Sequence, residues 1–130
     1  MKAARFYGER VVRVEEVEVK KLSKDEVRIE VEWCGICGVS GPMMIKNLPI
    51  TLGHEFSGTV TEVGENVTHV NLGDNVVVEP IQPCLACTNC KNGLNYLCEK
   101  LGQLDFKYDG FADYSVVNGS FVHKLQMIPS

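Results

Sequence analysis

Apolar and polar residues alternate in short stretches along most of the chain. In residues 27–33, valine, isoleucine and tryptophan occupy the odd positions and charged residues the even ones. This period of two is typical of a β-strand with one buried face. The same alternation, or a run of β-branched residues, predicts further strands at residues 1–7, 11–19, 53–64, 76–78, 111–117 and 121–125.

Turn-forming residues separate these stretches at short intervals. Gly8-Glu9, residues 71–75 and Asn118-Gly119 each lie between two predicted strands. No window of about a dozen residues has the period of an amphipathic helix. Many short strands with frequent turns predict an all-β barrel or sandwich. The whole of residues 1–130 is long enough for one core and is expected to form a single domain.

Composition narrows the class of partner. The chain is 45% hydrophobic and 23% charged, with a net charge of -4 and no basic run, so a nucleic-acid partner is not expected. No segment has the length and apolar character of a membrane span, and the N-terminus does not read as a signal peptide. We therefore expect a cytoplasmic protein, in which cysteines remain thiols. No pattern in the sequence indicates an oligomeric state.

Four cysteines form the strongest motif. Cys84, Cys87, Cys90 and Cys98 follow a C-x2-C-x2-C-x7-C spacing within residues 83–99. Tight turns between them direct the thiolates to one point, and four thiolates around one ion make a closed tetrahedral site of the kind that holds structural zinc. Iron is the rival metal, because soft thiolate sets also accept it. Disulfides or free buried thiols are a further alternative, which a reducing compartment disfavours.

A second group of candidate ligands comes from two separate stretches. Cys37 ends a C-x-x-C pair that begins at Cys34, and His54 is followed directly by Glu55. Cys37, His54 and Glu55 offer a thiolate, an imidazole and a carboxylate, and three protein ligands with one open position are typical of a catalytic metal. A redox-active C-x-x-C pair and a hydrogen-bonded core histidine remain alternatives. Cys34 itself is interpreted as a small buried apolar residue.

Several motifs together resemble one family. They are Cys-Gly-Ile-Cys-Gly at 34–38, Leu-Gly-His-Glu-Phe-Ser-Gly at 52–58, Val-Glu-Pro-Ile at 78–81, the four-cysteine motif, and Gly-Phe-Ala-Asp-Tyr at 110–114. The chain resembles the N-terminal GroES-like catalytic domain of zinc-dependent medium-chain alcohol dehydrogenases, and within them the butanediol and sorbitol enzymes. The resemblance implies a partly open β-barrel from which the four-cysteine lobe, residues 83–99, projects.

The resemblance also implies roles for the candidate residues. Cys37 and His54 would be ligands of a catalytic zinc, with Glu55 a ligand or the partner of one. The four cysteines would hold a structural zinc, expected at one ion per chain. In this family the catalytic zinc lowers the pKa of an alcohol or diol substrate, and the substrate then gives a hydride to NAD.

Other features depart from the family pattern. Val39 stands where a hydroxyl residue usually relays the proton, and the segment from 39 to 50 is shortened. The sequence has no G-x-G-x-x-G turn opening a helix, the fingerprint of a Rossmann cofactor domain. We therefore expect a truncated domain whose catalytic zinc is weakly held or missing and which does not turn over by itself, NAD binding being a property of full-length relatives. The alternatives are a free-standing metal-binding β-barrel without catalysis, natural or engineered, and an iron-based electron carrier.

Overall fold

The strands form two antiparallel sheets. The computed structural model describes residues 1–38, 48–101 and 109–126. The smaller sheet has the order β2-β1-β4 and the larger one the order β7-β3-β5-β6-β8. The strands are β1 (Lys2–Gly8), β2 (Val11–Glu16), β3 (Glu26–Cys34), β4 (Ile50–Thr51), β5 (Phe56–Val63), β6 (Asn75–Val78), β7 (Tyr114–Asn118) and β8 (Val122–Lys124).

Helical structure is limited to single turns in the described part of the chain. These are the α-helical turn α1 (Thr88–Lys91) and the 3₁₀ turns η1 (Asn95–Leu97) and η2 (Gly119–Phe121). The described residues contain no helix long and apolar enough to cross a membrane. The sequence showed no helical period, and the regular structure of the described residues is almost wholly β-strand.

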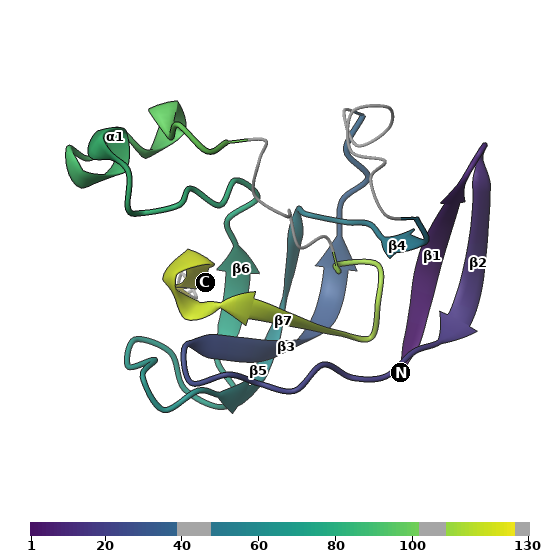
Figure 1. Cartoon of the computed structure of the whole chain (residues 1–130). Coiled ribbons are helices and arrows are strands. Elements are labelled where there is room, and N and C mark those ends of the chain that lie inside the picture. Colours follow the sequence, from purple (N-terminus) through teal and green to yellow (C-terminus); the bar gives the residue numbers. More distant parts are fainter. Residues whose placement is uncertain (39–47, 102–108, 127–130) are drawn as a thin grey trace.

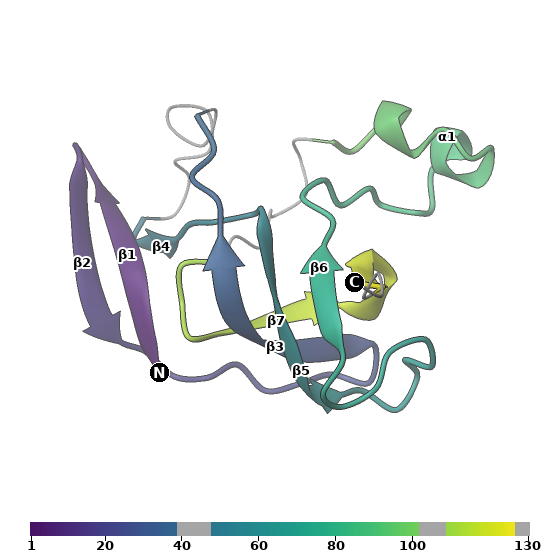
Figure 2. The ribbon, with the colours of Figure 1, turned by 180° about the vertical axis from the view of Figure 1, so that it is seen from behind.

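The larger sheet curves around the core without closing. Its two edge strands, β7 and β8, do not pair with each other in the described structure, so the barrel is partly open, as expected. Ten buried side chains fill it: Val27, Ile29, Phe56, Val60, Val70, Val76, Val78, Val117, Phe121 and Val122. The bridge between Ala3 and Ala112 joins the smaller sheet to the chain just before β7. Figures 1 and 2 show the β1–β2 hairpin on one side of the barrel and α1 on the other.

The pairing of β3 with β5 has two irregularities, and the second decides which side chains at the end of β3 face the core. The register with β5 shifts between Arg28 and Ile29 and again between Val31 and Trp33. The second shift places one extra residue on β3, which reverses the faces of the residues that follow. Trp33 is therefore 77% exposed, and Cys34 packs against the core in its place. The prediction of an unbroken alternation through residue 33 was wrong for this reason.

Several predicted strand boundaries were also wrong. The strand expected at 11–19 ends at Glu16, and the strand expected at 53–64 begins at Phe56. β7 starts at Tyr114 rather than at residue 111, and β8 is preceded by the 3₁₀ turn η2. Before β5 and β7 the backbone makes long-range bonds between loops, because the Gly110 amide donates to the Gly53 carbonyl and the Phe111 amide to the Leu52 carbonyl; the composition of these segments does not reveal such bonds.

Candidate metal centres

The lobe of residues 83–99 projects from the barrel and has little regular structure of its own (Figure 1). Its turns are closed by local hydrogen bonds: the Gly93 amide donates to the Cys90 carbonyl over 3.0 Å, and the Asn89 side-chain amide donates to the Leu97 carbonyl over 2.8 Å. Within residues 83–99 only Pro83, Cys90 and Cys98 are buried. The lobe therefore lacks an apolar core that would hold it together.

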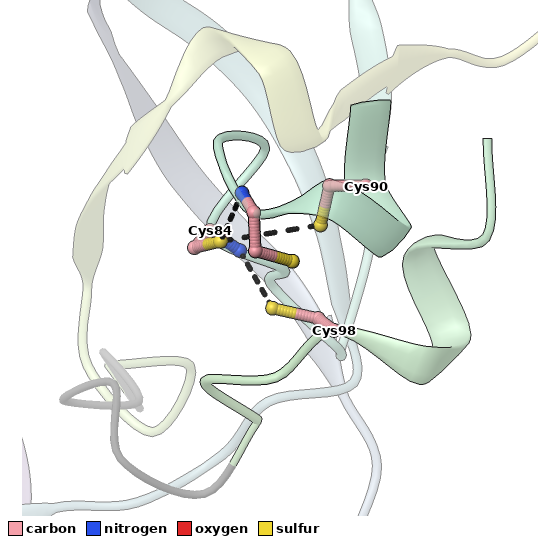
Figure 3. Close-up of side chains that lie close together, drawn as sticks. Cys84, Cys90 and Cys98 are labelled. Carbon is pink, nitrogen blue, oxygen red and sulfur yellow. Dashed lines mark hydrogen bonds between the residues drawn. The ribbon is translucent and has the colours of Figure 1, made fainter. Parts of the chain in front are cut away.

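The four cysteine sulfurs converge within this lobe. All lie within 4.8 Å of one another, and the sulfurs of Cys84 and Cys90 are 4.0 Å apart. Figure 3 shows the thiols of Cys84, Cys90 and Cys98 pointing toward a common centre. Sulfurs that surround one ion at about 2.3 Å in a tetrahedron would be about 3.8 Å apart. The sulfurs of Cys84 and Cys90 would need to move only slightly closer together to bind such an ion.

Backbone amides prepare this cluster for negative charge. The amides of Ala86 and Cys87 donate to the Cys84 sulfur over 3.4 and 3.3 Å, and the Cys84 amide donates to the Cys98 sulfur over 3.3 Å. Leu85 makes this turn possible with a left-handed φ of 57°. Amide donors stabilise a thiolate relative to a thiol.

The pKa values of the four thiols follow from these contacts. Donation from the amides of Ala86, Cys90 and Cys84, respectively, is the main cause that lowers the pKa of Cys84, Cys87 and Cys98. Burial, and then hydrogen bonding to Cys87 and Cys98, raises the pKa of Cys90. Amide donation thus favours the thiolate at three of the four cysteines, and burial opposes it at Cys90. All six cysteines are free, so neither predicted group is tied up in a disulfide.

The structure also brings Cys37, His54 and Glu55 together. One ligand atom from each lies within 4.8 Å of the others; Cys37 and His54 are partly buried and Glu55 is exposed. Cys37 follows β3 by three residues, and His54-Glu55 directly precede β5. Because β3 and β5 are paired neighbours, residues far apart in sequence meet at one end of the sheet (Figure 2). A thiolate, an imidazole and a carboxylate on one side of an ion form a donor set that zinc accepts, with room for a further ligand.

Backbone contacts hold this second cluster in place. The Gly35 amide donates to the Glu55 carbonyl over 2.7 Å, and the Gly110 amide donates to the Gly53 carbonyl over 2.9 Å. Gly53 has a φ of 99°, a conformation open to glycine. The turn before His54 is therefore fixed on both sides, by the end of β3 and by the segment before β7.

Cys34 lies between these segments without joining the cluster. A Cβ atom added to Gly53 or to Gly110 would come within 2.6 Å of the Cys34 sulfur, so the thiol packs directly against both glycines. Burial, and then the Glu55 carboxylate, raises the pKa of the Cys34 thiol to about 11. Cys34 packs against the core, as expected, but it is partly rather than fully buried.

The remaining predicted positions have ordinary structural roles or lie elsewhere. His69 contacts the Val122 carbonyl over 2.9 Å, and His123 contacts the Glu79 carboxylate over 3.1 Å. Val39, the position of the missing hydroxyl, lies outside the described residues. Sequence reasoning missed the roles of Gly53 and Gly110; the glycines themselves were visible in the motifs, but their shared neighbour was not.

Comparison with known proteins gives this fold and these clusters a family. The signature of the family described as the alcohol dehydrogenase GroES-like domain matches residues 23–127. The chain belongs to this family, which confirms the resemblance to the GroES-like domain of zinc-dependent medium-chain alcohol dehydrogenases drawn from the motifs.

Individual relatives extend the comparison. The chain is 38% identical to the (R,R)-butanediol dehydrogenase of Bacillus subtilis, covering 96% of this chain and 40% of that protein. It is 39% identical to the galactitol 1-phosphate 5-dehydrogenase of Escherichia coli K12, covering 88% and 35%, respectively. The crystal structure of galactitol-1-phosphate dehydrogenase from Escherichia coli superposes with a TM-score of 0.86 at 34% identity, over 97% of this chain and 38% of that one. The chain thus spans well under half the length of these relatives.

Proposed function

We propose that this chain is the zinc-binding catalytic portion of an NAD-dependent alcohol or polyol dehydrogenase whose substrates resemble butanediol. The observation that carries the proposal is the convergence of Cys37, His54 and Glu55 at the end of paired strands. Relatives named for butanediol, sorbitol and galactitol 1-phosphate support the substrate class. A solved structure of a dehydrogenase from Sinorhizobium meliloti, 30% identical to this chain, contains bound NADP, which supports a nicotinamide dinucleotide as the class of cofactor.

In this proposal the three residues hold a catalytic zinc. The Cys37 thiolate and the His54 imidazole bind it directly, and Glu55 binds it or orients a ligand. Zinc, when bound, supplies the Lewis acidity that lowers the pKa of an alcohol hydroxyl. Because Glu55 is exposed while Cys37 and His54 are partly buried, the carboxylate lies on the solvent side, where a substrate hydroxyl would arrive.

The four cysteines of the lobe hold a structural zinc in this proposal. Their site leaves no position open for substrate, so its role is to fold the lobe. Apparent binding free energies of structural zinc are about 10–16 kcal/mol at neutral pH, far more than the few apolar contacts of the lobe supply. The first equivalent of zinc is expected there and the second, held by one thiolate, more weakly.

Residues 1–130 are proposed to be inactive by themselves. Hydride transfer needs the nicotinamide within roughly 3–3.5 Å of the reacting carbon, and the sequence has no glycine-rich turn to bind the pyrophosphate. Val39 has no hydroxyl with which to pass on the substrate proton. Positioning and proton transfer are both affected, so repairing one does not restore the other.

The test combines metal analysis with substrate binding. The chain and its Cys37→Ser variant are loaded with one equivalent of zinc and then with Co²⁺, whose visible spectrum reports on its ligands. We expect butane-2,3-diol to change the cobalt spectrum of the chain but not that of Cys37→Ser. Calorimetry with NAD and a dehydrogenase assay at high protein concentration should show neither binding nor turnover.

Each other result favours a different function. A chain that takes up only one equivalent of metal is a metal-binding barrel without a catalytic site. Coloured protein purified with iron would instead identify an electron carrier. Turnover that disappears in Cys37→Ser would make residues 1–130 an enzyme in their own right.

A further inference from the structure

A single small side chain separates the segments that carry the candidate catalytic ligands. The Cys34 sulfur contacts Gly53, which directly precedes His54, and Gly110, whose amide donates to the Gly53 carbonyl over 2.9 Å. Cys34 itself ends β3, three residues before Cys37. Three segments form this end of the barrel: the end of β3, the turn before His54 and the segment at Gly110. The thiol belongs to the first and touches the other two.

These contacts leave little spare volume between the thiol and the two glycines. A Cβ on Gly53 would also come within 2.9 Å of the Phe111 amide nitrogen, and a Cβ on Gly110 within 2.8 Å of the Gly53 carbonyl oxygen. The two glycines let the backbones approach closely around the sulfur, with the Phe56 ring also close to Gly110, 2.9 Å from an added Cβ. Neither backbone can retreat easily, because Phe111 donates to the Leu52 carbonyl over 3.0 Å and bonds through its own carbonyl to Ala4.

We propose that Cys34 is a positioning residue whose volume sets the separation between Cys37 and His54, and so the affinity and geometry of the second metal site. The inference rests on the proposed function, because it assumes that these residues bind a metal. Cys34 does not touch the metal; it acts through the backbone of Gly53 and through its own link to Cys37. Groups that orient metal ligands typically change affinity by about 10–100-fold when they are altered.

Three substitutions of Cys34 distinguish an effect of side-chain volume from an effect of the thiol group itself. Cys34→Ser nearly conserves size and should keep the affinity for the second metal within about threefold. Cys34→Val adds a branch that must push on Gly53 or Gly110, and should weaken the second site by about tenfold or more. Cys34→Ala introduces no clash and so should fold even if the valine variant does not; it leaves the segments unsupported and should weaken the site by an intermediate factor.

The measurement uses cadmium-113 as the probe of both sites. A four-sulfur site and a one-sulfur site give well-separated cadmium resonances, and competition with a chromophoric chelator gives the affinity for the second equivalent. In Cys34→Val and Cys34→Ala the resonance of the second site should shift or broaden while that of the lobe is unchanged. Work well below the unfolding temperature ensures that a loss of general stability does not by itself lower the measured affinity.

The outcomes distinguish this inference from the function on which it rests. If the unaltered chain binds no second cadmium, both are wrong. If it does, and the alanine and valine variants bind it as tightly and with the same resonance, only the role of Cys34 is wrong. A graded loss in the order serine, alanine, valine, with the lobe intact, is the result expected.

Discussion

The backbone amide of Gly35 donates to the carbonyl of Glu55 over 2.7 Å, which ties the end of β3 to the residue beside His54. This bond continues the pairing of β3 with β5 beyond the last strand residues, where the register ends at Cys34 and Phe56. The candidate catalytic ligands therefore belong to the barrel. The four cysteines, by contrast, belong to a lobe with its own short-range contacts. The two centres should respond separately to mutation.

The first prediction concerns the lobe. Cys90→Ser replaces a buried thiol with a poor zinc ligand, so the lobe should lose its metal and unfold, because it has no apolar core to replace that energy. The strands should keep their far-ultraviolet circular dichroism and their slow amide exchange. Zinc content after dialysis against a chelator, measured beside amide exchange by NMR, checks both statements.

Cys34→Ser is the matched control for this experiment, since it removes a thiol outside the lobe. It should retain the tightly held zinc. Full zinc content in Cys90→Ser would contradict the assignment of the lobe as a zinc site.

The second prediction concerns the left-handed residue of the lobe. Leu85 has a φ of 57° and is 46% exposed, so a substitution there tests the backbone more than packing. Leu85→Val places a β-branched side chain where such residues are genuine outliers, and should weaken metal binding by about tenfold, equivalent to about 1.4 kcal/mol. Leu85→Gly should bind the metal at least as tightly as the unaltered chain does, because glycine adopts this φ without strain.

Competition with a chromophoric chelator measures both variants. Equal affinities for the valine and glycine variants would show that this turn does not govern the site.

The third prediction concerns the close approach of the paired strands β3 and β5 at Gly58. A Cβ on Gly58 would lie 2.0 Å from the Glu30 carbonyl oxygen and 2.9 Å from a methyl carbon of Ile29. Gly58→Ala must therefore separate β3 from β5, and should destabilise the barrel by about 3 kcal/mol or more. Gly38→Ala is the control, since no atom of the described residues lies within 4 Å of its added Cβ, and should change the free energy of unfolding by less than about 0.5 kcal/mol. Urea unfolding of both zinc-loaded variants decides the matter; similar midpoints would refute it.

The fourth prediction is a pH dependence. The Asn71 amide and the Lys124 ammonium, which lies 3.0 Å from the carboxylate, hold the pKa of Asp74 below its usual range. A carboxyl whose folded pKa is lowered stabilises the protein fully above its unfolded pKa of about 3.9, and this stabilisation is lost as the pH falls through the lower folded value. Asp74→Asn should therefore unfold at lower urea than the unaltered chain at neutral pH, and the difference should shrink below about pH 4.

Comparing the two proteins at each pH cancels the loss of zinc in acid, which affects both. Glu65→Gln provides the control, because the ion pair of Glu65 with Lys24 is highly exposed and exposed pairs contribute little. A difference between Asp74→Asn and the unaltered chain that stays constant with pH would exclude the carboxylate as its cause.

Much of this protein follows from its sequence alone. Alternation in residues 27–33 and the many turn residues predicted an all-β fold, because side chains on a strand necessarily alternate between its faces. The spacing of Cys84, Cys87, Cys90 and Cys98 predicted a cluster, because residues so close in sequence can meet through local turns. A metal site whose ligands lie close together in the sequence can therefore be predicted without knowing the tertiary structure.

Only the tertiary structure decided how the distant segments meet. The extra residue between Val31 and Trp33 turns Trp33 outward and Cys34 inward. The alternation of apolar and polar residues in the sequence does not predict this bulge. The contact of Cys34 with both Gly53 and Gly110 depends on that reversal and on the pairing of β3 with β5. Such contacts join residues tens of positions apart, and their distances are fixed by packing of the whole barrel rather than by any local preference of the chain.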